Sequence, residues 1–294
     1  MLYRANHTTR YQYSETVSTC HNEVRLKPRT LASQKLENFR IAVTPSPHSF
    51  ADRKDYFGND VRYFCVLEPH TELILTASST VRVTPQEIPP PGSTPAWERV
   101  REYLRQAPDW EALRAYEFTA ESPLVPVGRE YEAYARESFF KGRPVLEAAV
   151  ELCSRIHRDF VYLPSSTTID TSVAEVFRTR RGVCQDFAHV MIAMLRSLGL
   201  AARYVSGYLR SGAQYTGAEA SHAWVSLFVP SSGWIDLDPT NRVIPTDGHL
   251  TLAWGRDYQD VTPVKGVSLG GGQHVVTVEV RVVALEQAPS SAAV

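Results

Sequence analysis

The chain carries, at residues 180–189, the stretch RRGVCQDFAH, and its interpretation decides the fold of everything around it. Beyond it, apolar residues recur at three- and four-residue steps and predict a helix that stops at Gly199; they are Phe187, Val190, Met191, Met194, Leu195 and Leu198. This spacing places Cys184 in the first turn, where unpaired backbone N–H groups and the helix dipole favour a thiolate. A cysteine presented in this way is typical of a nucleophile.

Cys184 has an ordinary alternative, because most cysteines are buried as small hydrophobic residues. Besides the helix terminus, two local features favour catalysis: Gly182 permits a close approach, and Arg180 and Arg181 lie just upstream. The backbone N–H of the cysteine can also donate to an oxyanion, where one donor contributes roughly 3 kcal/mol. Cys153 instead lies on an apolar helical stripe, which predicts a packed core residue.

The motif Ser221-His222-Ala223-Trp224 offers an imidazole at the start of an expected strand. The alternating residues of 223–229 form one apolar face, so His222 lies on the opposite face of the strand. An ordinary, half-exposed strand histidine is the competing interpretation.

A hairpin brings a carboxylate to the same face as this imidazole. Residues 230–233, PSSG, predict a turn between strands at 222–229 and 233–238. Residue 230 lies midway between His222 and Asp238, so the two side chains are expected nearly opposite one another. Asp236 shares the face but is nearer the turn and more solvated, whereas Pro239 ends the strand directly after Asp238. We therefore predict a catalytic set of Cys184 as nucleophile, His222 as proton acceptor and donor, and Asp238 as orienting carboxylate.

The composition excludes several classes of function. The 294 residues contain 31 Lys and Arg against 32 Asp and Glu, so no strong field attracts nucleic acid or an anionic membrane. The start, MLYRANHTTRYQY, lacks the layout of a secretion signal, and no apolar run reaches membrane-spanning length. The four cysteines show no CxxC pairing, which argues against a zinc site or a disulfide framework. We expect a cytoplasmic protein with a usable thiol, no metal and no cofactor.

The chain divides into three segments by pattern. Residues 1–84 show β-type alternation and predict an antiparallel β-sandwich domain. Residues 85–95 are rich in proline and predict a stiff linker. Residues 96–294, which turn helical and then strand-like, predict the catalytic domain, with a final strand at 275–283.

These segments resemble the transglutaminase-like superfamily, in the bacterial type that carries an extra N-terminal β domain. The resemblance covers about 165–266 closely and rests on GVCQDFAHVMIAMLRSLGLAARYVSGY at 182–208, SHAWVSLFVPSSGWIDLDPTN at 221–241 and GRDYQDVTP at 255–263. The opening segment, with HNEVRLKP at 21–28 and DYFGN at 55–59, is similar to that family's N-terminal region. The resemblance implies an α+β fold in which the cysteine's helix packs on an antiparallel sheet, and a papain-like triad that maps onto Cys184, His222 and Asp238.

The family's chemistry implies acyl transfer from an amide through a cysteine thioester. We expect hydrolysis of protein or peptide amides, with glutamine-dependent cross-linking as the alternative that differs only in the acceptor. A non-catalytic peptide-binding scaffold is the third possibility. No DxDxDG calcium loop is present, so no metal is expected.

Four other features receive weaker interpretations. His189 is expected to be packed and hydrogen-bonded, and Asp186 to stabilise the first turn of its helix. Arg203 is expected to pair with Asp186 or Asp257. The segment 255–260 is expected to dock near the crevice.

Overall fold

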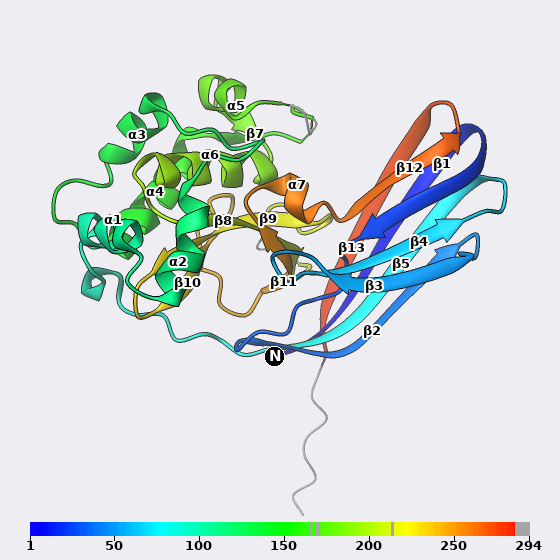
Figure 1. Cartoon of the computed structure of the whole chain (residues 1–294), viewed down its shortest axis with the longest axis horizontal. Helices are drawn as coiled ribbons and strands as arrows, with labels where there is room; N and C mark the ends of the chain where they lie inside the picture. Colours follow the sequence, from blue (N-terminus) through cyan, green and yellow to red (C-terminus); the bar gives the residue numbers. More distant parts are fainter. Residues whose placement is uncertain (165, 169–170, 213–214, 286–294) are drawn as a thin grey trace, which may run out of the picture.

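The computed structural model describes residues 1–164, 166–168, 171–212 and 215–285, which form two domains (Figure 1). The predicted antiparallel β domain and the α+β domain are both confirmed. The last part of the predicted catalytic segment, residues 286–294, lies outside the described residues. Among the described residues, no helix combines the length and the apolar character needed to cross a membrane.

The first domain is built on one long strand that serves both halves of a seven-stranded sheet. Residues 2–12 of this strand pair with β5 and residues 2–13 with β13. After a register break, residues 20–24 pair with β4 and residues 17–24 with β12. Apolar side chains from β1, β2, β4 and β5 pack together as its core. The strands are β1 (Leu2–Val24), β2 (Gln34–Thr44), β3 (Ser49–Lys54), β4 (Asp60–Val66), β5 (His70–Val83), β12 (Val264–Gly270) and β13 (His274–Leu285).

The chain returns to this first sheet at its C-terminal end, which differs from the predicted division at residue 96. The expected strand at 275–283 is present within β13, but β12 and β13 both pair with β1 rather than with the second domain. Val280 and Val282 are buried in one cluster with Tyr3 and Ala5. An alternating apolar strand can complete either sheet, so its pattern does not reveal which partner it takes.

The second domain packs helices against a four-stranded antiparallel sheet in the order β10-β9-β8-β11. Its long central helix, α6, packs on β8 and β9 through an apolar core (Figure 1). The helices are α1 (Trp97–Gln106), α2 (Trp110–Tyr116), α3 (Arg129–Arg136), α4 (Val145–Asp159), α5 (Val173–Thr179), α6 (Cys184–Ser197) and α7 (Tyr258–Val261), with short 3-10 turns η1 (Pro91–Ser93) and η2 (Glu117–Thr119). The strands are β6 (Val161–Tyr162), β7 (Arg181–Gly182), β8 (Ala202–Leu209), β9 (His222–Val229), β10 (Gly233–Leu237) and β11 (His249–Gly255).

Candidate active site

The predicted nucleophile is the first residue of α6, as the sequence indicates. Its approach is held by the short parallel pairing of β6 with β7, in which Tyr162 lies beside Gly182. The Asp186 carboxylate closes the turn by accepting hydrogen bonds from the Val183 N–H at 2.8 Å and from the Thr167 hydroxyl at 2.7 Å. The Cys184 thiol remains partly exposed, unlike the three other cysteines, which are buried.

Gly182 is required by this turn, because a Cβ at that position would lie 2.7 Å from the Cβ of Asp186. The predicted close approach is therefore confirmed. Arg180 does not serve the thiol, however, because its guanidinium lies over the rings of Phe177 and Phe160 at 4.1 and 4.6 Å.

His222 and Asp238 meet as predicted, but through a different register of the hairpin. Asp236 pairs with Ser226 and Leu237 with Val225, so the position opposite Asp238 belongs to Trp224 rather than to His222. The shift from the expected register is two residues, an even number, so both side chains stay on one face. His222 Nε2 and Asp238 Oδ2 lie 2.9 Å apart, and both side chains are fully buried.

The rival carboxylate has another partner. Asp236 Oδ2 accepts a hydrogen bond from the indole N–H of Trp224 at 2.9 Å, so it is committed to packing within the sheet. Trp224 itself is fully buried, which fits strand packing rather than a wall of the cleft.

The carboxylate of Asp238 is surrounded by donors. Its Oδ1 accepts the backbone N–H groups of Thr240 and Asn241 at 2.9 and 3.1 Å. Its Oδ2 accepts, besides His222, the Asn241 amide at 2.8 Å and His249 Nε2 at 3.0 Å. Although burial alone would raise the pKa of Asp238, the two histidines hold it well below its ordinary value. The group is therefore a carboxylate at neutral pH.

The imidazole of His222 is held in its protonated form. Burial works to lower its pKa, but the charges of Asp238 and Cys184 outweigh that effect and raise the pKa to about 10. Because Nε2 is bonded to Asp238, Nδ1 is the nitrogen left for proton exchange, and it is buried with no hydrogen-bond partner among the described residues. The Cys184 thiol is close enough to this ring to raise its pKa.

Sequence reasoning missed two residues beside the reacting groups. A Cβ on Gly217 would lie 3.1 Å from His222 Nδ1 and 3.3 Å from the Tyr162 hydroxyl, so the glycine separates the two. Burial, followed by the charge of Cys184, raises the pKa of Tyr162 to about 12, which keeps a phenol proton available beside the thiol. Neither residue carries a local signal, because a long-range strand pairing and a loop crossing bring them to the site.

His249 and Asn241 were also missed. The alternation in HLTLAW at 249–254 could have predicted β11, but nothing in it indicates that its first residue bonds Asp238. His222, Asp238 and His249 offer ligand atoms within 4.8 Å of one another, a set that could hold a metal ion. In this structure each histidine donates a hydrogen bond to the Asp238 carboxylate. The expectation that no metal is bound stays a prediction.

The weaker interpretations have mixed outcomes. His189 is packed as expected: burial lowers its pKa to about 4, and Nε2 accepts the Tyr258 N–H at 3.2 Å, which docks the 255–260 segment on α6. Arg203 pairs with neither predicted aspartate. Its guanidinium lies between the rings of Trp254 and Trp234, at 3.7 and 4.3 Å. Burial lowers the pKa of Arg203 to about 9, and the charge of Asp236 offsets part of that effect.

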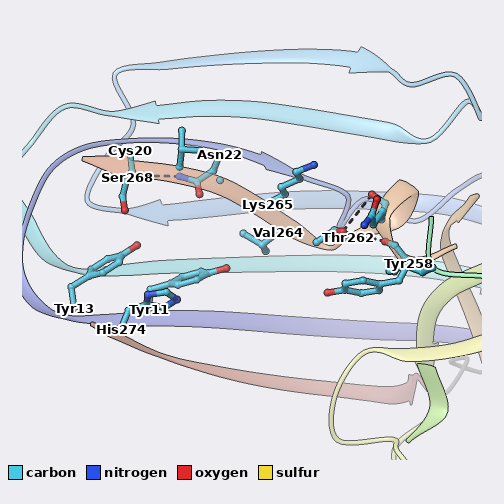
Figure 2. A pocket seen from close by; sticks show the side chains of 14 residues that line it. Tyr11, Tyr13, Cys20, Asn22, Tyr258, Thr262, Val264, Lys265, Ser268 and His274 are labelled. Carbon is cyan, nitrogen blue, oxygen red and sulfur yellow. Dashed lines mark hydrogen bonds between the residues drawn. The ribbon is translucent and has the colours of Figure 1, made fainter. Parts of the chain in front are cut away.

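A separate groove of about 590 Å³ lies on the first domain, between β1, β12 and β13 (Figure 2). Tyr11, Tyr13 and His274 line one part of it, and Tyr258 lies at the end near the second domain. None of the predicted catalytic residues lines this groove. The ring of Tyr258 lies 6.4 Å from that of Tyr204. Burial, followed by the charge of Cys184, raises the pKa of Tyr204.

The fold and the site together define an α+β protein in which a helix-terminal cysteine meets a histidine and an aspartate on an antiparallel sheet. The family model of the bacterial transglutaminase-like N-terminal region matches residues 3–82, and that of the transglutaminase-like superfamily matches residues 132–239. The chain belongs to the transglutaminase-like superfamily, in the form that carries the bacterial N-terminal region.

Relatives extend over the whole chain. An uncharacterized protein of Mycobacterium tuberculosis is 38% identical over 97% of this chain and 93% of its own length, and one of Mycobacterium leprae is 32% identical over 96% and 98%. A protein-glutamine gamma-glutamyltransferase of Pseudomonas aeruginosa is 36% identical over 30% of this chain and 14% of its own length. A solved structure from Cytophaga hutchinsonii, described as a candidate cysteine protease, superposes with a TM-score of 0.77 at 22% identity, covering 98% of this chain and 92% of that one. The last likeness shows the fold alone.

Proposed function

We propose that the protein is a thiol-dependent enzyme that cleaves protein or peptide amides through a thioester on Cys184. The observation that carries the proposal is the 2.9 Å hydrogen bond between His222 Nε2 and Asp238 Oδ2, formed beside a partly exposed cysteine at a helix N-terminus. This arrangement supplies a nucleophile, a proton carrier and an orienting group in one place.

The reaction follows from these positions. Cys184 Sγ attacks the amide carbonyl carbon, and the thiol proton resides on His222 Nδ1. The backbone N–H of Cys184, at the start of α6, is the donor we propose for the oxyanion. His222 then gives its proton to the departing amine as the C–N bond breaks. Water attacks the resulting thioester, its proton passes to His222, and the C–S bond breaks to restore the thiol. Asp238 stabilises the imidazolium throughout.

We propose water as the usual acceptor, because hydrolysis needs no dedicated site for a second substrate whereas transfer to a lysine does. The experiment uses glutamine-containing peptides with a labelled amine, and mass spectrometry counts released acid against incorporated amine. Both products should vanish in the Cys184→Ala variant. If amine incorporation predominates and depends on Cys184, the proposed activity becomes transamidation instead of hydrolysis.

One observation favours that alternative. The carboxylate of Glu219 is near enough to contribute to the raised pKa of the Tyr162 hydroxyl, so a negative charge is available to hold an acceptor ammonium. If transamidation operates, Glu219→Gln should raise the KM for the amine about tenfold and leave hydrolysis unchanged. Exposed Glu121, changed to Gln, is the matched control.

The scaffold alternative makes a different prediction. If the fold only binds peptides, Cys184→Ala should bind and act as the native protein does, and iodoacetamide should label Cys184 no faster than Cys153. A cytoplasmic location and a protein or peptide substrate remain parts of the proposal.

A further inference from the structure

We propose that the N-terminal domain is a working part of the catalytic centre: it fixes strand β11, and His249 of that strand is a positioning residue for Asp238. The inference rests on the proposed function, because it concerns the group that orients His222. It assigns a role to a second histidine and to a domain that the Cys-His-Asp set does not contain.

The first step is the contact at Asp238. His249 Nε2 lies 3.0 Å from Asp238 Oδ2, the same oxygen that His222 Nε2 meets at 2.9 Å. A carboxylate can only accept, so both ring nitrogens donate to that oxygen. The His249 ring is buried and stands edge-on to Trp224, with ring centroids 5.1 Å apart. His249 thus holds the same carboxylate oxygen that orients the reacting imidazole.

The second step is the position of β11, which is the edge strand of its sheet and, among the described residues, pairs as a strand with β8 alone. Its other edge is bonded by the first domain. The Gln34 amide donates to the Thr251 carbonyl at 2.8 Å and accepts the Thr251 N–H at 2.8 Å. The Asn59 amide does the same for Trp254, at 2.9 and 3.0 Å. Each amide therefore takes the place of one residue of a neighbouring strand.

The side-chain amides of Gln34 and Asn59 are buried where they bond β11. Gln34 and Asn59 are buried, at 3% and 0% exposure, in a region where an unpaired amide would be costly. The Gln34 amide also donates to the Arg29 carbonyl, and the Arg29 N–H donates to the Thr251 carbonyl at 3.1 Å. A strand held on both edges at Thr251 has little freedom to shift, and His249 is only two residues away. Contacts therefore run without a gap from Gln34 through β11 to Asp238.

The test compares variants that keep or remove the donor at position 249. His249→Leu should lower kcat for peptide-amide cleavage roughly 10- to 100-fold with little change in KM, because one hydrogen bond to a charged group is lost. His249→Gln, whose amide N–H can reach the same oxygen, should recover most of that loss. His48→Leu, at a half-exposed histidine of the first domain, is the control and should leave kcat unchanged.

The domain's part is tested by Gln34→Leu, with exposed Gln12→Leu as control. We expect kcat per folded molecule to fall roughly 3- to 10-fold. The double variant Gln34→Leu/His249→Leu should lose less than the product of the two single effects, since both act on Asp238 through β11. The pH profile of kcat should change in His249→Leu and return toward the native profile in His249→Gln. The charged or titratable groups that face Asp238 there are His222, His249, Cys153 of α4 and Tyr162 of β6.

Three results would overturn the inference. The first is a folded His249→Leu variant whose kcat and pH profile match those of the native protein. The second is a double variant whose loss of kcat equals the product of the two single losses. Gln34 would then act independently of His249 and have only a structural role. The third is stoichiometric zinc in the purified protein that is lost in His249→Leu, which would make His249 a ligand. Failure of the proposed function is distinct, since activity would then survive Cys184→Ala.

Discussion

Asp236 and Asp238 stand two residues apart on one face, yet their surroundings give them different roles. Asp238 accepts from two imidazoles, an amide and two backbone N–H groups, while Asp236 accepts from the Trp224 indole. A carboxylate that stabilises a neighbouring imidazolium must be buried, ionised and held in one orientation. Only Asp238 meets these conditions.

This difference predicts unequal effects of the same substitution. Asp238→Asn should lower kcat roughly 10³- to 10⁴-fold, because the amide stabilises the wrong tautomer of His222. Asp236→Asn should change kcat less than about tenfold and act mainly on stability, since it weakens one partly buried hydrogen bond. Steady-state kinetics on the two variants, with circular dichroism to verify folding, make the comparison. Equal losses in both would contradict the assignment.

The raised pKa of His222 predicts the pH dependence of thiol labelling. The imidazolium persists until the pH rises through about 10, so the thiolate–imidazolium pair should exist at neutral pH. If Cys184 forms an ion pair with this imidazolium, its alkylation by iodoacetamide should stay fast well below the ordinary thiol pKa of about 8.5. Because the folded pKa exceeds the unfolded one, the stabilisation from this group is complete below about pH 6.5 and is lost as pH rises toward 10.

Cys153 is the internal reference for that measurement. Burial raises the pKa of its thiol, and it lies in the core of α4. At pH 7 it should react at least roughly 100-fold more slowly than Cys184, as read by mass spectrometry of labelled peptides. A Cys184 rate that follows an unperturbed thiol would count against the pair.

At the scale of elements, the turn from β7 into α6 sets the thiol's position, and Gly182 is its least replaceable residue. Gly182→Ala would place a methyl group 2.7 Å from the Cβ of Asp186. We expect a loss of about 1–3 kcal/mol in the free energy of unfolding and slower alkylation of Cys184, because the helix terminus must move. Urea unfolding and labelling rates measure both effects. Gly92→Ala, where the methyl meets Glu147 Oε2 at an ordinary 3.5 Å, is the control.

The hairpin shows how far periodicity alone can predict a site. Alternation along each strand places His222 and Asp238 on the same face of the hairpin. The observed register differs from the predicted one by two residues, an even number, so the shared face is still predicted correctly. The helix start at Cys184 is likewise local, since apolar spacing and Gly199 determine it. Tyr162, Gly217 and His249 reach the site through pairings between distant segments, which no local pattern specifies. The charge of Arg203 is known from the sequence and predicts a carboxylate partner. The indole rings of Trp234 and Trp254 are brought to its two sides only by the fold.

At the scale of the whole molecule, the C-terminal part of the chain returns to the sheet in which the chain begins. β1 opens the first sheet, and β12 and β13 complete it after the second domain has been built. The two domains are therefore not successive segments, and the first cannot be complete until residue 285 is in place. Side-chain amides of Gln34 and Asn59 then join this sheet to β11.

This closure predicts that the two domains unfold together. A chain ended after Thr262 lacks β12 and β13, so β1 loses a partner along both halves and Val280 and Val282 leave the core shared with Tyr3. The full chain should show one calorimetric transition, and the shortened chain should melt more than about 10 °C lower and lose activity. Two separated transitions in the full chain, with the upper one unchanged by the truncation, would show instead that the second domain is stable without the strands that return to β1.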